Sequence, residues 1–240
     1  TDVTSSEAVL VLMGPNSRKL LSEISPNRFD NNHHSFGSAK EIEIGYGLAR
    51  AHRISYVGEL GWELYVSSDQ ACHVFEAIRE VGKKYDLRLC GLHSLDSCRI
   101  EKAYRHFGHD ITDEDHVLEA GLGFAVQTNK DDFIGKEAVI RKNNQGLGKF
   151  LYQFQLEDPD LLLFHNEPIY RDGELVSYLT SGNYGHFLGS AIGMGYIPLK
   201  EESIKSVETS DFHIEIAGTM AKAKISSKPL YDPNSEKVRM

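Results

Sequence analysis

Arg53-Ile54-Ser55-Tyr56-Val57-Gly58-Glu59-Leu60-Gly61-Trp62-Glu63-Leu64-Tyr65 is the stretch around which the chain is organised. Apolar and polar residues alternate on both sides of two glycines, which predicts a strand, a turn and a second strand. Gly58 and Gly61 bound the turn, where a residue without Cβ can adopt a positive φ. Glu63 and Tyr65 are two positions apart, so a strand presents them on one face. A carboxylate beside a phenol suits a planar heterocycle that carries hydrogen-bond donors.

The composition is that of an ordinary globular protein. The 240 residues are 40% hydrophobic and 25% charged, which suffices for one large domain or two smaller ones. The net charge of -9 and the lack of a basic stripe argue against nucleic acid as a partner. No apolar run reaches about 18 residues, so the sequence predicts no membrane span.

Cysteine usage and the first residues bear on the compartment and on the extent of the chain. Cys72, Cys90 and Cys98 form no Cys-x-x-Cys motif and are odd in number. Reduced thiols are typical of a cytoplasmic protein or, in a eukaryote, of the mitochondrial matrix. The opening Thr1-Asp2-Val3 has no initiator methionine and no signal peptide, and a predicted strand follows almost at once. We therefore expect a fragment of a longer polypeptide.

The first part of the chain mixes strands and helices. Asp69 is expected to cap an amphipathic helix whose apolar stripe includes Val74 and Ile78. The polar segment 26–38, which contains His33 and His34, predicts a solvated loop. The other predicted elements are strands over 9–13, 40–44 and 48–56, helices over 17–24, 94–104 and 132–143, and a short strand after Phe124.

A second pattern begins after a plausible hinge at 144–148. Short alternating stretches separated by turns are typical of a small antiparallel barrel or sandwich. The predicted fold class is therefore α+β, with an α+β domain over 1–146 and an all-β domain over 147–240. The predicted strands of the second domain are 150–156, 168–170, 175–180, 191–196, 212–216 and 220–225.

Several polar groups have both a chemical and a structural interpretation. Glu59 and Glu63 could form a carboxylate pair, although one of them is more simply a surface residue. His106 and His109 could bind a metal or act as a base, but no carboxylates converge on them, so we predict no metal site. Arg99 is either part of a solvated face or a semi-buried structural or anion-binding arginine. The polar segment 181–186 is either a functional loop or an ordinary hairpin loop.

Taken together, these residues resemble the aminomethyltransferase (glycine cleavage T-protein) superfamily. The resemblance is strongest to the C-terminal tetrahydrofolate-binding region of FAD-dependent sarcosine and dimethylglycine dehydrogenases or oxidases. It implies a partial aminomethyltransferase folate-binding fold followed by a small antiparallel β-barrel. The stretches that carry it occur in family order and are residues 53–65, 95–105, 118–122, 132–138 and 180–189.

The resemblance also implies a folate site. It implies that Tyr56 and Glu63 contact the pterin ring and that Leu64 and Tyr65 line the same pocket. A pterin presents its N3–H and 2-amino group side by side, and one carboxylate can accept both hydrogen bonds. Arg99, of the Leu-Asp-Ser-x-Arg motif, is implied to belong to the folate site or to its immediate support.

Tyr184 is a further candidate, because the resemblance places it in a C-terminal loop that faces the cleft. The aspartate that the family uses for acid–base chemistry is expected upstream of Thr1. The catalytic residue of this chain is therefore left unassigned.

The implied reaction is one-carbon transfer coupled to amine oxidation. FAD, bound by a separate upstream domain of the same polypeptide, would oxidise an N-methyl amine substrate. Tetrahydrofolate would capture the released carbon as 5,10-methylenetetrahydrofolate, while the protein supplies positioning. Two alternatives stay open: a stand-alone aminomethyltransferase or folate-dependent demethylase, and a non-catalytic regulatory homologue that kept the fold.

Overall fold

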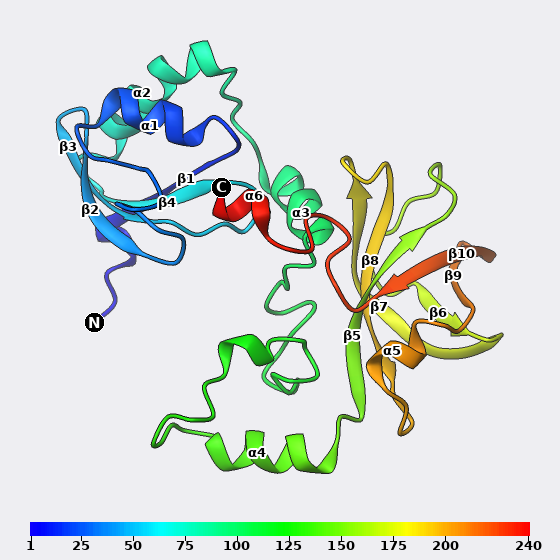
Figure 1. Cartoon of the computed structure of the whole chain (residues 1–240). Coiled ribbons are helices and arrows are strands. Elements are labelled where there is room, and N and C mark those ends of the chain that lie inside the picture. The colour runs from blue at the N-terminus through cyan, green and yellow to red at the C-terminus, as the bar shows by residue number, and fades with distance from the viewer. The chain divides into compact units, whose positions relative to one another are not determined.

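The computed structural model describes residues 1–240 and divides into two compact units. Unit 1 comprises residues 1–95 and 234–240, and unit 2 comprises residues 96–233. Each unit is described by itself (Figure 1). The domain boundary between residues 146 and 147 stays a prediction.

Unit 1 is a four-stranded antiparallel sheet covered on one face by two helices (Figure 1). Its strand order is β1-β4-β3-β2, from β1 (Glu7–Met13), β4 (Gly61–Ser67), β3 (Gly47–His52) and β2 (Ala39–Ile44). Alternate residues of β4 point into the core, which they share with the apolar stripes of α1 (Ser17–Ile24) and α2 (Ala71–Gly82). Trp62, Leu64 and Val66 are at most 1% exposed. The period-2 pattern of the second predicted strand is therefore confirmed.

The strand predicted over residues 48–56 is wrong beyond His52. β3 ends there, and residues 53–60 form an irregular connection to β4. The regular pairing ends at Arg53, whose N–H bonds the Ser38 carbonyl and whose carbonyl accepts from Gly37 N–H, each at 2.9 Å. One residue is thus opposite two successive residues, as in a β-bulge, and the ladder does not continue beyond it. Gly58 has the expected positive φ of 76°.

Gly61 has no positive φ and is needed for a different reason. A Cβ at this position would lie 2.1 Å from the Met13 sulfur and 2.7 Å from the Leu12 carbonyl oxygen. The glycine therefore permits the close pairing of β1 with β4, where Met13 and Gly61 are register partners.

Two local expectations in unit 1 are also wrong. α2 begins at Ala71 with Gln70 as its N-cap, and no side chain caps it, so Asp69 does not. The Gln70 N–H already bonds the Ser67 carbonyl, which places a turn before the helix. His34 is fully buried rather than solvated, with its ring 6.2 Å from the Phe29 ring.

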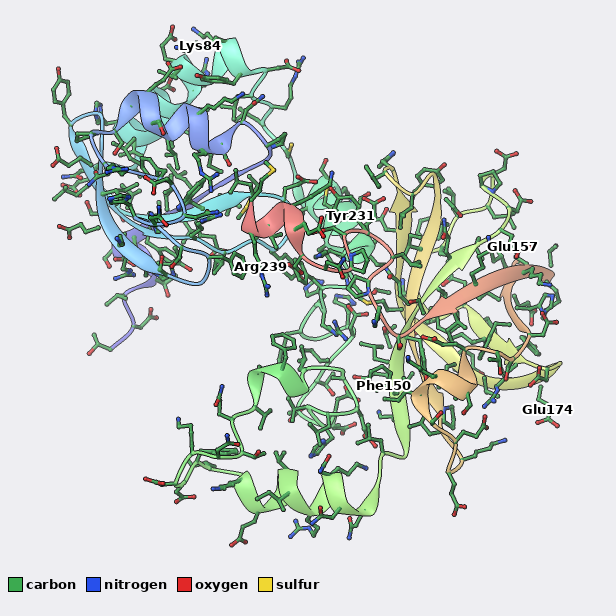
Figure 2. All side chains as sticks on the ribbon, viewed as in Figure 1. Lys84, Phe150, Glu157, Glu174, Tyr231 and Arg239 are labelled. Atoms are coloured by element: carbon green, nitrogen blue, oxygen red, sulfur yellow. The ribbon has the colours of Figure 1, made fainter.

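Unit 2 contains a closed six-stranded antiparallel barrel of order β10-β5-β8-β7-β6-β9, which confirms the barrel prediction. Side chains such as Phe150 and Tyr152 of β5 belong to its core, with ring centroids 5.3 Å apart. Phe150, near the start of β5, is labelled in Figure 2. The strands of the barrel match the predicted stretches closely. They are β5 (Lys149–Leu156), β6 (Pro168–Arg171), β7 (Glu174–Gly185), β8 (Ser190–Pro198), β9 (Phe212–Ile216) and β10 (Thr219–Ser226).

β7 is longer than the sequence predicts. Residues 181–185 of the expected loop 181–186 belong to this strand. Its pairing with β8 continues through Tyr184 opposite Ala191 and Gly185 opposite Ser190. Backbone hydrogen bonding to a neighbouring strand therefore prevails over a polar, glycine-containing sequence that alone favours a turn.

The remaining elements are helical or irregular. α3 spans Leu92–Glu101 and α4 spans Lys136–Gln145. The strand expected after Phe124 is wrong, because residues Gly123–Ala125 form a 3₁₀ turn closed by the Val126 N–H to the Gly123 carbonyl. No helix has the length and apolar character that crossing a bilayer requires. The short helices are η1 (Thr4–Ser6), η2 (Lys83–Tyr85), α5 (Ile204–Val207) and α6 (Glu236–Arg239).

Candidate functional site

Glu63 and Tyr65 lie side by side on the face of β4 that points away from the unit 1 core, as the strand period predicts. Both are half-buried, and the Tyr65 hydroxyl donates a hydrogen bond to Oε2 of Glu63 at 3.0 Å. This bond is the main cause of the raised pKa of Tyr65, because ionising the phenol would place two negative charges together. The bond leaves Oε1 of Glu63 as a carboxylate acceptor.

Cationic and aromatic groups from β3 complete this face. His52 is the register partner of Glu63, and Arg50 is the register partner of Tyr65. The His52 ring lies 4.6 Å from the Tyr65 ring, and the Arg50 guanidinium lies 5.2 Å from the same ring. The two contacts restrict the phenol ring and so favour the hydrogen bond of its hydroxyl to the carboxylate.

The other two unit 1 candidates have different surroundings. Tyr56 is half-buried in the irregular segment 53–60, beside a turn in which the Ser55 hydroxyl accepts from Val57 N–H at 3.3 Å and Glu59 N–H at 3.2 Å. Leu64 is 0% exposed and belongs to the core on the opposite face from Glu63. Its side chain therefore supports the strand from behind instead of sharing the Glu63 surface.

The hollow next to this face is lined by both polar and apolar side chains and includes only one of the candidates. Its volume is about 410 Å³, and Tyr65 lines it, whereas Tyr56 and Glu63 do not. The hollow therefore does not coincide with the Glu63 surface. The other residues that line the hollow are Glu7, Ala39, Lys40, Glu41, Leu48, Ala49, Arg50, Ser67 and Gln70.

Arg99 lies in unit 2 and is buried, with 1% exposure. Its Nε donates to Asp96 at 2.6 Å, and its Nη1 donates to Asp110 at 2.5 Å, to the Tyr104 carbonyl at 3.2 Å and to Ser181 at 3.3 Å. Of the two alternatives for Arg99, a solvated helix face and a semi-buried arginine, the structure therefore supports the second. Two carboxylates accept from this guanidinium, and Asp110 also interacts electrostatically with the Arg105 guanidinium, so the positive charge of Arg99 is already paired within the chain.

Asp110 is the centre of this cluster and was not singled out by the sequence. It is 0% exposed, and its Oδ1 accepts from the hydroxyls of Thr180 and Ser181, each at 2.6 Å. Its Oδ2 accepts from Arg99 and, at 2.9 Å, from His106 N–H. The signal available in the sequence was the density of polar residues over 96–110, but their partners on β7 are 70 and 71 positions away.

Tyr184 is linked to the same cluster through its neighbours on β7. Asn183 donates to Oδ2 of Asp96 at 3.1 Å, and the Ser97 hydroxyl donates to the Tyr184 carbonyl at 2.6 Å. The Tyr184 ring is half-buried and lies 5.2 Å from the His186 ring in an edge-on arrangement. The side chain of Asp96, with 34% exposure, is the part of the cluster that reaches solvent.

The end of α3 is buried rather than solvated. Glu101 is 5% exposed and accepts from Phe187 N–H at 2.8 Å and Leu188 N–H at 2.9 Å, while Lys102 pairs with Asp232 at 3.0 Å. These contacts attach α3 to the barrel. The His106 and His109 rings are 4.5 Å apart, and no group of three or more metal-binding side chains exists in the chain.

Two family models match the chain. The GCVT N-terminal domain matches residues 1–130, and the glycine cleavage T-protein C-terminal barrel domain matches residues 149–232. A solved aminomethyltransferase T of the glycine cleavage system from Bartonella henselae superposes on 95% of this chain and 60% of its own, with a TM-score of 0.80. Its sequence is 21% identical, so this likeness concerns the fold.

Curated relatives include enzymes of amine oxidation. A 4-methylaminobutanoate oxidase (formaldehyde-forming) from Paenarthrobacter nicotinovorans is 39% identical over 99% of this chain. Human mitochondrial sarcosine dehydrogenase is 32% identical over 99% of the chain. An aminomethyltransferase from Halothermothrix orenii is 38% identical over 79% of the chain. The chain spans 28%, 26% and 52% of the length of these three proteins.

Proposed function

The chain belongs to the GCVT N-terminal domain family, and we propose that it holds tetrahydrofolate within an FAD-dependent N-methyl amine dehydrogenase or oxidase. The observation that carries the folate assignment is the Glu63–Tyr65 pair. A carboxylate whose one oxygen is held by a phenol presents its other oxygen in a defined direction. Each carboxylate oxygen has two lone pairs, so Oε2 can accept a second bond beside the one from Tyr65, and the two oxygens together suit the two adjacent donors of a reduced pterin.

The residues of unit 1 have distinct roles in this proposal. Glu63 accepts hydrogen bonds from the pterin ring, Tyr65 orients Glu63, and Tyr56 contributes aromatic surface and a hydroxyl. Leu64 keeps β4 in place through its core contacts. When bound, tetrahydrofolate supplies N5 and N10 as the acceptors of the one-carbon unit, giving 5,10-methylenetetrahydrofolate.

Arg99 and Tyr184 belong to the proposal as candidates in unit 2. Because Arg99 is ion-paired with Asp96 and Asp110 and donates to Ser181 of β7, we assign it the role of a support that holds Asp96 and β7 in place. Tyr184 offers a half-buried ring beside that support. Each residue is tested separately from Glu63, with Arg99→Lys and Tyr184→Phe as the mildest changes.

The test of the folate assignment is isothermal titration of tetrahydrofolate into the full-length polypeptide that carries this chain. Glu63→Gln keeps the shape of the side chain and removes its charge, and we expect affinity to fall about 10- to 100-fold, the worth of a charge-assisted hydrogen bond. Glu43→Gln is the matched control, an exposed glutamate on β2 of the same sheet that does not line the hollow. Equal affinity of both variants and the wild type would remove Glu63 from the site.

The proposal of a flavin domain rests on the oxidase and dehydrogenase relatives. This chain spans about a quarter of the length of those proteins. Names such as sarcosine and dimethylglycine dehydrogenase point to small N-methyl amines as substrates of those proteins. We infer an upstream FAD domain in the same polypeptide. The absorption spectrum of the purified full-length protein, and its bleaching by sarcosine or dimethylglycine, test this directly.

Two other functions have a specific observation in their favour. The aminomethyltransferase relative favours a stand-alone folate enzyme without a flavin domain. A mouse protein named as a pyruvate dehydrogenase phosphatase regulatory subunit, 33% identical over 95% of this chain, favours a non-catalytic homologue. Amine-dependent formation of methylenetetrahydrofolate by the full-length protein separates the three. A flavoenzyme forms it with bound FAD, a stand-alone enzyme forms it without FAD, and a regulatory homologue does not form it.

A further inference from the structure

Glu63 has two direct neighbours on the strands beside β4. Val11 of β1 and His52 of β3 are its register partners. Side chains in such positions start about 4.5–5.5 Å apart, so these two are the nearest cross-strand groups to the carboxylate. The side chain of Val11 is apolar and cannot form a hydrogen bond. His52 is therefore the direct neighbour that can offer a polar contact to a molecule bound at Glu63.

The other donors around Glu63 already have partners. The Tyr65 hydroxyl bonds Oε2 of Glu63 at 3.0 Å. The Arg50 guanidinium, two residues before His52 on β3, pairs with Glu7 at 3.2 Å. The His52 ring, by contrast, lies 4.6 Å from the Tyr65 ring and has no hydrogen bond or ion pair within the chain. It is also half-buried, so its nitrogens are available to a ligand on this face.

The edge of a pterin requires a donor beside the carboxylate. That edge presents three groups in a row: the 2-amino group and N3–H, which are donors, and the 4-carbonyl oxygen, which is an acceptor. A carboxylate complements the first two and cannot complement the third. An acceptor that is desolvated without a donor weakens binding. An imidazole carries at least one N–H in either protonation state, so His52 has the required chemistry next to Glu63.

We propose that His52 donates a hydrogen bond to the 4-carbonyl oxygen of the pterin, while Glu63 accepts from the two donors beside that oxygen. This inference rests on the proposed function, because it names a second polar contact for the same ligand. The pair recognises the whole edge of the ring as donor, donor and acceptor, which a carboxylate alone does not. His52 is thereby a residue that determines which heterocycles this face binds.

Two substitutions separate the N–H of His52 from its ring. His52→Phe keeps an aromatic ring against Tyr65 and removes both nitrogens, whereas His52→Gln keeps an N–H donor. Isothermal titration of tetrahydrofolate into the full-length polypeptide should give an affinity about 3- to 10-fold lower for His52→Phe, the worth of one hydrogen bond. His52→Gln should recover most of that loss. His165→Phe, at an exposed histidine of unit 2, is the matched control and should bind like the wild type.

The outcomes separate this inference from the folate assignment. If Glu63→Gln weakens binding but His52→Phe binds like the wild type, the hydrogen bond from His52 is overturned and the folate assignment stands. Equal losses in His52→Phe and His52→Gln would also overturn it, because a lost donor would not be their cause. If neither Glu63→Gln nor His52→Phe changes the affinity, both proposals fail. Thermal unfolding of each variant, followed by circular dichroism, shows that a change in affinity is not a loss of fold.

Discussion

The Tyr65 hydroxyl donates a hydrogen bond to Oε2 of Glu63 at 3.0 Å, from a position two residues further along the same strand. The contact joins neighbours on one face of β4, so it needs no loop or distant element to form. Its consequence is an oriented carboxylate on the face of the sheet that points away from the core.

Removal of that contact should weaken tetrahydrofolate binding without abolishing it. Tyr65→Phe deletes a single hydrogen bond and leaves the ring, so we expect a loss of affinity of about 3- to 10-fold. Titration calorimetry on the full-length protein measures it. Tyr46→Phe is the matched control, because Tyr46 is 98% exposed. A Tyr65→Phe variant that binds as tightly as Tyr46→Phe would show that Glu63 needs no orientation by the phenol.

The buried tyrosines of unit 2 should make stability fall at alkaline pH. Burial is the main cause that raises the pKa of Tyr152 and of Tyr196 above the ordinary 10.0. The folded state therefore holds these protons more tightly, so their contribution is complete below pH 10 and is lost as pH rises toward the folded pKa.

In this alkaline range, Tyr196→Phe should reduce the decline in unfolding free energy by about 1.4 kcal/mol per pH unit. Urea unfolding of wild type and variant at several pH values above 10 measures the two slopes. Tyr178→Phe, at an exposed tyrosine of β7, is the control. Parallel slopes for wild type and Tyr196→Phe would contradict the assignment.

Loss of the Asp110 carboxylate should strongly destabilise unit 2. Asp110→Ala leaves Arg99 buried without one of its two ion-pair partners and removes the acceptor of two hydroxyls, so we expect a loss of about 3–5 kcal/mol. Thr180→Val, which removes one donor of the cluster, should cost about 1 kcal/mol.

Urea unfolding monitored by circular dichroism measures both losses. Asp113→Ala is the control, because Asp113 is an exposed aspartate of the same segment. Similar midpoints for Asp110→Ala and Asp113→Ala would mean that the cluster adds no net stability.

Substitution of Gly58 and of Gly61 by alanine should destabilise the chain for two different physical reasons. Gly61→Ala places a methyl group against Met13 and the Leu12 carbonyl, so overpacking should cost about 1–3 kcal/mol. Gly58→Ala forces a side chain into a positive φ of 76°, for about 1–2 kcal/mol.

A second substitution separates the two causes in thermal unfolding. Met13→Ala removes the sulfur in question, so it should partly rescue Gly61→Ala and leave Gly58→Ala unchanged. Equal rescue of both variants would contradict this explanation.

Local patterns predicted much of the molecule. Strand alternation was sufficient to place Trp62 and Leu64 in the core and Glu63 and Tyr65 on the opposite face. The same rule, repeated in short stretches between turns, predicted the six strands of the barrel. These features depend on the period of side chains along one segment, which a sequence displays directly.

Secondary structure predicted from the pattern of one segment was wrong where hydrogen bonds to residues far away in the sequence decided the conformation. Arg53 has the pattern of a regular strand residue, yet its N–H and carbonyl bond two successive residues, Ser38 and Gly37, and the ladder ends there. Residues 181–185 read as a loop, yet β8 pairs with them as a strand. In both cases hydrogen bonds to residues outside the segment decide the local conformation.

The sequence by itself determined the buried face of β4 and the position of Glu63 and Tyr65 together on the other face, because both follow from spacing within a strand. Only the tertiary structure decided that Asp110 holds Arg99, and that Arg18 and Arg53 share the oxygen of Met240. Those contacts join groups far apart along the chain. A buried charge becomes stable only when folding brings its partners to it, and no periodicity encodes which partners they will be.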